Sequence, residues 1–227
     1  MEFTMKTYDE ITKKEIQNPD LTKGYLYEGT VVTGKTEPKT VIMNGSVTSD
    51  RLEGLREHKP AEDIIEPCMY YHKHTEEDLK QEIDLKITKL ESSRDEIVYA
   101  GADITLSDGT KKHFTYTPAD QTDVSDMFNA VMLGMSAYIY HNGEYDCEIY
   151  SKEDIIIIYS TLSSLKTKEK TYCSQLCGYV KTLKTVPEVK AVTYGQTLTD
   201  MYLEKYNTLL AFAMTEMQNT LERLGKQ

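Results

Sequence analysis

The clearest hydrophobic pattern is a seven-residue spacing of apolar side chains in the segment 152–185. One series consists of Ile155, Leu162, Leu176 and Leu183, with Glu169 in the missing place, and a second consists of Ile158, Leu165, Tyr172 and Tyr179. A repeat of about 3.5 residues puts both series on one stripe of a helix and favours helices that run side by side. The pattern therefore predicts a long helix. Ser151 and Asp154 cap its start, and Val186-Pro187 ends it.

The polar run Lys166–Lys170 interrupts this stripe. It leaves an alternative in which the segment forms a helical hairpin with its bend at these residues.

A last helix is predicted from about 198 to 224. Leu203, Leu210, Met217 and Leu224 are again seven residues apart, with Tyr206 and Ala213 between them. Gly225 follows, where a helix stop is expected. This stripe packs either on the helix of 152–185 within one chain or on another molecule, and the spacing is compatible with both.

Two β-hairpins are predicted between the residues 98 and 151. Their turns are Asp108-Gly109 and Asn142-Gly143, which are preferred residue pairs for tight hairpin turns. The strands are 102–106 with 111–117, and 137–141 with 144–149. Between the hairpins, Thr122 or Asp123 caps a short helix that runs through Val124 to Met132.

The first 74 residues are predicted to form an extended, β-rich arm. Strand-like runs cover 3–8, 25–33, 40–43 and 64–71, and the turns are Asn18-Pro19-Asp20, Lys23-Gly24, Asn44-Gly45 and Lys59-Pro60. Because the apolar content of this arm is thin, we expect no independent core there. The arm instead wraps a partner or packs on the rest of the chain.

A helix with a narrow apolar stripe follows the arm. Thr75 is a suitable N-cap, and the stripe consists of Leu79, Ile83, Leu90 and Ile97 on a charged background. Such a helix is mostly solvated, which is typical of a linker or of a strut that faces a partner.

Together these elements predict an α+β fold in four parts. The parts are an extended β-rich arm (1–74), a linker helix (75–97), a compact domain of two hairpins and helices (98–190) and a long C-terminal helix (191–227).

The composition narrows the classes of partner. The 227 residues carry a formal net charge of −11, so the overall field repels nucleic-acid phosphates and anionic lipid. The most apolar run, 155–159, is too short to span a bilayer. The first ten residues are charged, so we expect no signal peptide and a place in the cytoplasm. Seventeen tyrosines and no tryptophan suit wet protein interfaces, or equally half-exposed strands.

Candidate chemistry is sparse. Cys68, His72 and His74 would share one face of a strand, with His58 nearby, but their spacing matches no four-ligand zinc template, and a polar strand face is the favoured alternative. Cys173 and Cys177 lie four residues apart in mid-helix, which favours two buried thiols over a redox pair. We find no nucleophile elbow, phosphate loop or paired carboxylates, and we therefore assign no catalytic residue, metal site or cofactor.

Two stretches resemble phage proteins. The segment 98–185 holds, in this order, Asp108-Gly109 in a hairpin, Phe114, Asp120-Gln121 before a helix, a second hairpin, and a helix opened by Ser151-Lys152-Glu153-Asp154. This order resembles a small domain of phage tail-fibre assembly proteins and their gene neighbours. In 8–80, the phrases 16–21 (IQNPDL) and 66–71 (EPCMYY) are similar to the N-terminal module of small phage and prophage proteins of Gram-positive bacteria. The helix after Lys190 departs from the simplest form of the small domain.

The resemblance implies a tail-region accessory protein that binds tail-fibre or baseplate subunits as an assembly chaperone or adaptor in the host cytoplasm. A permanent minor subunit of the tail tip or baseplate in the virion is the alternative, and an enzyme or metal-binding protein is a third. The family offers no catalytic residues to transfer. The interface residues that we predict are Leu203, Leu210, Met217, Leu224, Tyr70 and Tyr71. Self-association through the last helix remains an option.

Overall fold

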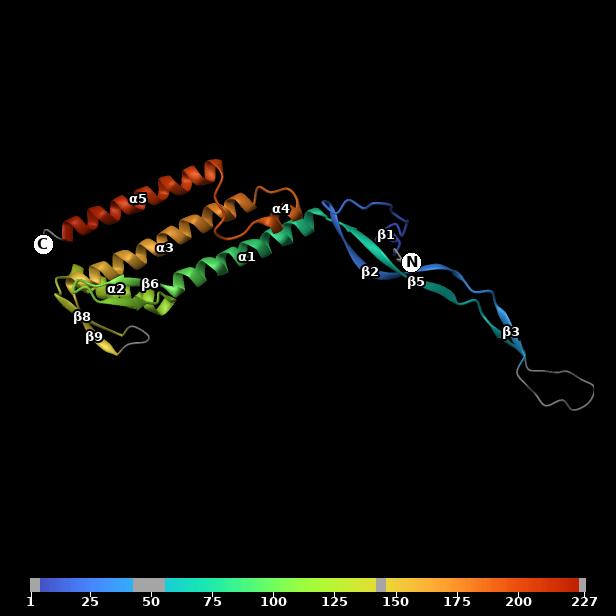
Figure 1. Ribbon diagram of the computed structural model, residues 1–227, viewed down its shortest axis with the longest axis horizontal. Coiled ribbons are helices and arrows are strands. Elements are labelled where there is room, and N and C mark those ends of the chain that lie inside the picture. The colour runs from blue at the N-terminus through green and yellow to red at the C-terminus, as the bar shows by residue number, and fades with distance from the viewer. Residues whose placement is uncertain (1–4, 43–55, 142–145, 225–227) are drawn as a thin grey trace, which may run out of the picture. The chain divides into compact units, whose positions relative to one another are not determined.

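The computed structural model describes residues 5–42, 56–141 and 146–224, without the side chains of 40–42 and 56–58. The described residues form nine strands and five helices (Figure 1), which confirms the predicted α+β class. The chain divides into two compact units, Met1–Glu77 and Asp78–Gln227. Where the sequence suggested four segments, the packing thus groups the residues into two. Within the described residues, no helix combines the length and the apolar content that a bilayer span requires.

The N-terminal unit is built on a long antiparallel ribbon. Strands β2 (Gly24–Lys35) and β5 (Asp63–Lys73) pair along their whole length, and β1 (Thr7–Asp9) lies parallel to β5 on its other side. Strands β3 (Lys39–Ile42) and β4 (Arg56–Lys59) form a second antiparallel pair. The sequence analysis missed β4, which has no apolar alternation. The predicted turn at Asn44-Gly45 lies outside the described residues.

Two tyrosines hold this ribbon together. The Tyr70 hydroxyl donates to the carbonyl oxygen of Thr30 at 2.8 Å, and the Tyr71 hydroxyl donates to that of Asp20 at 2.8 Å. The rings lie against glycines, because a Cβ atom added to Gly29 would stand 2.6 Å from the Tyr70 ring and one added to Gly24 would stand 2.6 Å from the Tyr71 ring. Aromatic rings that cover strand glycines stabilise a sheet that has few apolar residues.

Few residues of this unit are buried. Among those whose burial the structure describes, the buried ones are Gly24, Cys68, Tyr70 and Tyr71. The apolar content of this region is thin in the sequence, and correspondingly few of its described side chains are buried.

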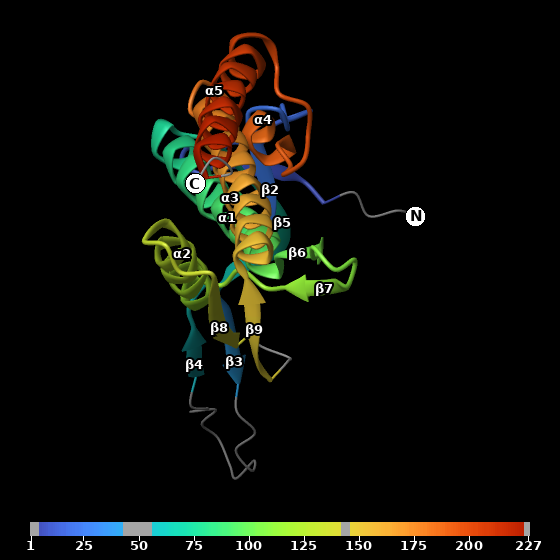
Figure 2. The ribbon, with the colours of Figure 1, turned by 90° about the vertical axis from the view of Figure 1, so that its left-hand side faces the viewer.

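The C-terminal unit combines helices and two hairpins. Its elements are α1 (Glu76–Ala100), β6 (Ala102–Thr105), β7 (Lys111–Phe114), α2 (Pro118–Met132), β8 (Ala137–His141), β9 (Cys147–Ser151), α3 (Lys152–Val180), α4 (Val186–Ala191) and α5 (Asp200–Leu224). Both predicted hairpins are present, although Asn142-Gly143 lies outside the described residues. Helix α3 runs between α5 on one side and α1 on the other (Figures 1 and 2). Gly225 is also outside the described residues.

Capping residues explain the helix boundaries. Ser151 and Asp154 form the predicted capping box of α3. Helix α2 instead begins at Pro118 with a capping box from Thr117 and Asp120, so the predicted caps Thr122 and Asp123 are wrong. Pro118 starts the helix because its fixed φ suits the first helical turn.

The long helix differs from the prediction at its middle and at its end. Helix α3 continues through Lys166–Lys170, so the hairpin alternative is wrong. It ends at Val180, before Val186-Pro187. Those two residues open the short helix α4, which Thr185 and Glu188 cap, because proline is compatible with a first helical turn.

Two apolar cores lie along α3. The first gathers the β6–β7 and β8–β9 hairpins, α2 and the beginning of α3, and includes Ile155, Ile158 and Leu162. The second gathers the end of α3, α4 and the following loop, and includes Leu176 and Val180. Helix α1 contributes to both.

Most of the stripe predicted for α1 is packed. Leu90 is buried in the second core, and Leu79 and Ile83 pack against that core. Ile97 is exposed, and its neighbour Val98 enters the first core instead. The helix that the sequence analysis named a linker therefore has apolar residues in both cores.

Two glycines in β2 provide a matched test of ring packing. Gly29→Ala should loosen the ribbon by about 1–3 kcal/mol, because the added methyl group has no room beside the Tyr70 ring. Gly34→Ala should change stability by less than about 0.5 kcal/mol, because its Cβ atom meets only Ile64 Cδ1 at an ordinary 3.7 Å. Native-state hydrogen exchange of the β2 and β5 amides measures both variants. Equal protection in the two variants would contradict the packing role of Tyr70.

Two tyrosine hydroxyls of the C-terminal unit should respond in opposite ways to removal. The buried Tyr140 hydroxyl has no hydrogen-bond partner among the described residues, so Tyr140→Phe should be neutral or stabilise the unit by about 1 kcal/mol. The Tyr194 hydroxyl donates to the Glu169 carboxylate at 2.9 Å, so Tyr194→Phe should cost about 1–3 kcal/mol. Urea unfolding of each variant checks the difference. The same loss in both would show that Tyr140 has a partner after all.

Candidate partner-binding surface

Helix α5 packs on α3 through aromatic pairs. Tyr202 meets Tyr179 edge to face at 5.9 Å between ring centroids, and Tyr206 meets Tyr172 at 6.2 Å. The Tyr202 hydroxyl donates to the carbonyl oxygen of Gly178 at 3.2 Å. A Cβ atom at that glycine would lie 3.1 Å from the Tyr202 ring, so the glycine permits the close approach.

Further along the same seam, the two helices leave an apolar cavity of about 170 Å³. Its lining includes Leu165 of α3 and Leu210, Ala213, Met214 and Met217 of α5. Leu210 and Met217 of the stripe predicted for the last helix therefore face α3 of the same chain. Of the two arrangements that the sequence allowed, the structure has the packing within one chain.

The residues predicted as an interface take up different environments. Leu210 and Met217 are half-buried against α3, Leu203 is exposed, and Leu224 is buried in the first core. Tyr70 and Tyr71 are buried within the N-terminal unit, and their hydroxyls bind its backbone. These six residues do not form one patch, because they belong to two units.

Several large side chains on the outer sides of α5 are exposed. Phe212 is 68% exposed, and Met201, Leu209 and Met214 are also exposed. They flank the seam and make α5 amphipathic with a wider apolar face than α3 covers.

The outer face of the β8–β9 hairpin is an exposed apolar strand surface. Ile139 and Ile149 stand directly opposite each other in the register and are 63% and 73% exposed. The inner face carries Tyr140 and Tyr150, which are both buried. We use the name hairpin patch for Met135, Ala137, Ile139 and Ile149.

The hairpin patch is hollowed. A shallow depression of about 500 Å³ is lined by Met135, Ala137, Tyr138, Ile139 and Ile149. The sequence analysis missed this surface, although the runs 137–141 (AYIYH) and 147–151 (CEIYS) hold the signal. In both runs, apolar side chains occur on both faces of the strand. A strand with one buried face and one solvated polar face does not account for this pattern.

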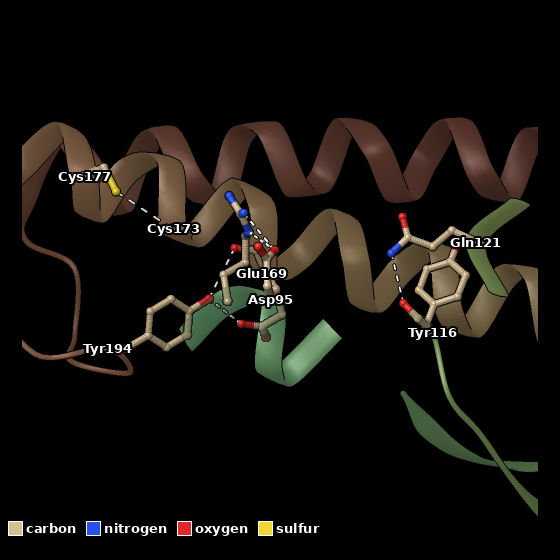
Figure 3. Close-up of polar contacts among 8 residues, drawn as sticks. Asp95, Tyr116, Gln121, Glu169, Cys173, Cys177 and Tyr194 are labelled. Atoms are coloured by element: carbon tan, nitrogen blue, oxygen red, sulfur yellow. Dashed lines mark hydrogen bonds and ion pairs between the residues drawn. The ribbon is translucent and has the colours of Figure 1, made fainter. Parts of the chain in front are cut away.

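A polar layer separates the two cores (Figure 3). Glu169 is 9% exposed and accepts a hydrogen bond from the Tyr194 hydroxyl at 2.9 Å. Burial raises the pKa of Tyr194, and the bond to Glu169 raises it further. On α1, Arg94 Nη2 lies 2.8 Å from the Asp95 carboxylate. Glu169, which occupies the missing apolar place in the seven-residue series, therefore makes a buried polar contact.

The candidates Cys68, His72 and His74 belong to the N-terminal unit. His72 contacts Glu10 and stacks near Tyr25, while Cys68 is buried against Gly29 across the ribbon. Among the described residues, no three His, Cys, Asp and Glu side chains come together as a metal-binding group would require. The His58 side chain is not described.

The helical cysteines lie close together. Cys173 and Cys177 are free thiols with their Sγ atoms 3.9 Å apart (Figure 3). The contact with Cys177, followed by burial, raises the pKa of Cys173. These features fit packed thiols at a helix contact.

Two substitutions on α5 separate its packed face from its exposed face. Leu210→Asp should cost about 2 kcal/mol or more, because it puts a carboxylate into the apolar cavity against α3. Phe212→Asp introduces the same charge into α5 but lies on the exposed side, so it should cost less than about 0.5 kcal/mol. Thermal and urea unfolding of the full chain measures both. If Leu210→Asp is as harmless as Phe212→Asp, the α3–α5 seam is not a stable contact.

Comparison with models of protein families, with curated proteins and with solved structures finds no match to this chain.

Proposed function

We propose that this protein is a protein-binding accessory factor of a phage tail, which binds tail-fibre or baseplate subunits as an assembly chaperone or adaptor. The observation that carries the proposal is the hairpin patch, where Ile139 and Ile149 form an exposed apolar pair. Burial of a side chain of this kind contributes about 1.5–3 kcal/mol, so a partner that covers the pair gains several kcal/mol. Contiguous exposed apolar surface of this kind marks an interaction site.

The backbone of the hairpin supports the same role. In the described residues β8 and β9 form a two-stranded sheet, so each strand has one edge that no third strand covers. Such an edge pairs readily with a strand of another protein. A subunit that exposes unpaired strands before assembly is a suitable partner, because the hairpin satisfies its backbone while the isoleucines cover its apolar face.

The kind of partner comes from the resemblance of the segments 98–185 and 8–80 to phage tail-region proteins. The net charge of −11 supports a protein partner over a nucleic acid. The alternative is a permanent minor subunit of the tail tip or baseplate. Such a subunit uses the same surface, and it differs from a chaperone or adaptor in that it stays in the finished particle.

Site-specific photocrosslinking tests the proposal. A photoreactive residue is placed at Ile139 and, as a matched control, at Thr105, which is exposed on the other hairpin. In cells that produce tail-fibre and baseplate subunits, we expect adducts with one of these subunits from position 139 and none from position 105. Ile149→Lys should abolish the adduct without changing stability by more than about 0.5 kcal/mol, because the side chain is exposed.

Adducts of equal yield from both positions, or adducts that persist in Ile149→Lys, would overturn the proposal. Mass spectrometry of purified particles then separates the two roles. A chaperone or adaptor of assembly is missing from them, whereas a structural subunit is present at fixed stoichiometry.

A further inference from the structure

A cavity of about 220 Å³ lies within the C-terminal unit beside the polar layer. Its polar lining consists of Arg94, Asp95 and Tyr99 of α1, Gln121 of α2, and Lys166 and Lys170 of α3. Gln121 donates to the carbonyl oxygen of Tyr116 at 2.9 Å, which fixes its side chain at the wall (Figure 3).

The charge of this cavity is opposite to that of the chain. The whole sequence has 37 acidic and 26 basic residues, yet the lining has three cations and one carboxylate. That carboxylate, Asp95, is already bound to Arg94 at 2.8 Å. The cavity therefore has a local positive electrostatic potential in an acidic protein.

Two lysines of the cavity lie in an energetically unfavourable arrangement. Lys166 and Lys170 are one helical turn apart on α3, and like charges at this spacing destabilise a helix. Among the described residues, neither lysine reaches a carboxylate within ion-pair distance. Burial, followed by the charge of Lys170, lowers the pKa of Lys166.

A contact with an aromatic ring accounts for little of this arrangement. The Lys166 Nζ atom lies 5.8 Å from the centroid of the Tyr116 ring. This distance is close to the limit of about 6 Å for a useful cation–π contact. An anion in the cavity would instead offset both the burial of Lys166 and the repulsion between the two lysines.

We propose that this cavity binds a phosphate group, either as inorganic phosphate or as the phosphate of a small phosphomonoester. Lys166, Lys170 and Tyr99 line the space and carry hydrogen-bond donors, and phosphate accepts several charge-assisted hydrogen bonds at once. The cavity volume of about 220 Å³ leaves room for a phosphate group with a short stem. The site is separate from the hairpin patch and does not depend on the protein-binding role.

Calorimetric titration of the full chain tests the site. Inorganic phosphate and glycerol phosphate are titrated separately into the protein in chloride buffer of constant ionic strength. We expect saturable binding at one site per chain. Lys170→Gln and Lys166→Met should each weaken it about tenfold or more, because each removes one charge-assisted contact.

Lys205→Gln on α5 is the matched control, since this exposed lysine lies outside the cavity. It should leave the affinity unchanged. Lys170 is exposed, so its variant is expected to fold, and circular dichroism checks this. Tighter binding of glycerol phosphate indicates a phosphomonoester ligand, and equal or weaker binding indicates inorganic phosphate. No saturable heat from the wild-type chain, or an equal loss in all three variants, would overturn the proposal.

Discussion

The C-terminal unit depends on the need to cover the apolar stripe of α3 along its whole length. The helix runs from Lys152 to Val180, and its two ends lie in different apolar cores. The hairpins and α2 pack on its beginning, and α4 and the loop after it pack on its end. Helix α1 contributes to both cores, and α5 covers a further side through the tyrosine pairs. The two cores follow from this division, with Glu169 and Tyr194 at the polar layer between them.

This polar layer has structural consequences beyond its own hydrogen bond. A buried carboxylate requires donors, and the Tyr194 hydroxyl ties the loop between α4 and α5 to the middle of α3. The same region of α3 carries Lys166 and Lys170 toward α1, where Arg94 and Asp95 are paired. Polar residues that interrupt an apolar stripe thus fix the register of neighbouring helices and open a charged cavity next to them. The N-terminal unit is packed differently, because two tyrosine rings buried over glycines take the place of an aliphatic core.

The apolar residues that remain exposed are not spread evenly. On the β8–β9 hairpin the inner face closes the first core with Tyr140 and Tyr150, while the outer face presents Ile139 and Ile149 to solvent. Helix α5 similarly packs one face on α3 and leaves Phe212 outside. Neither surface is needed for the packing of the unit that carries it. Exposed apolar surfaces of this kind offer binding energy to another molecule.

The sequence alone determined the elements whose signals are local. The seven-residue spacing identified α3 and α5, Ser151 with Asp154 marked the start of α3, and Asp108-Gly109 marked the first hairpin. Local signals failed where a residue suits two structures, because Val186-Pro187 was interpreted as the end of the long helix although it opens α4. Only the tertiary structure decided which element packs on each apolar face. An apolar stripe in the sequence indicates that a helix face must be covered, but it does not indicate which element covers it. For the same reason Tyr70 and Tyr71 proved to be buried in the ribbon, while the exposed isoleucine pair and the cavity with Lys166 and Lys170 emerged from residues brought together by folding.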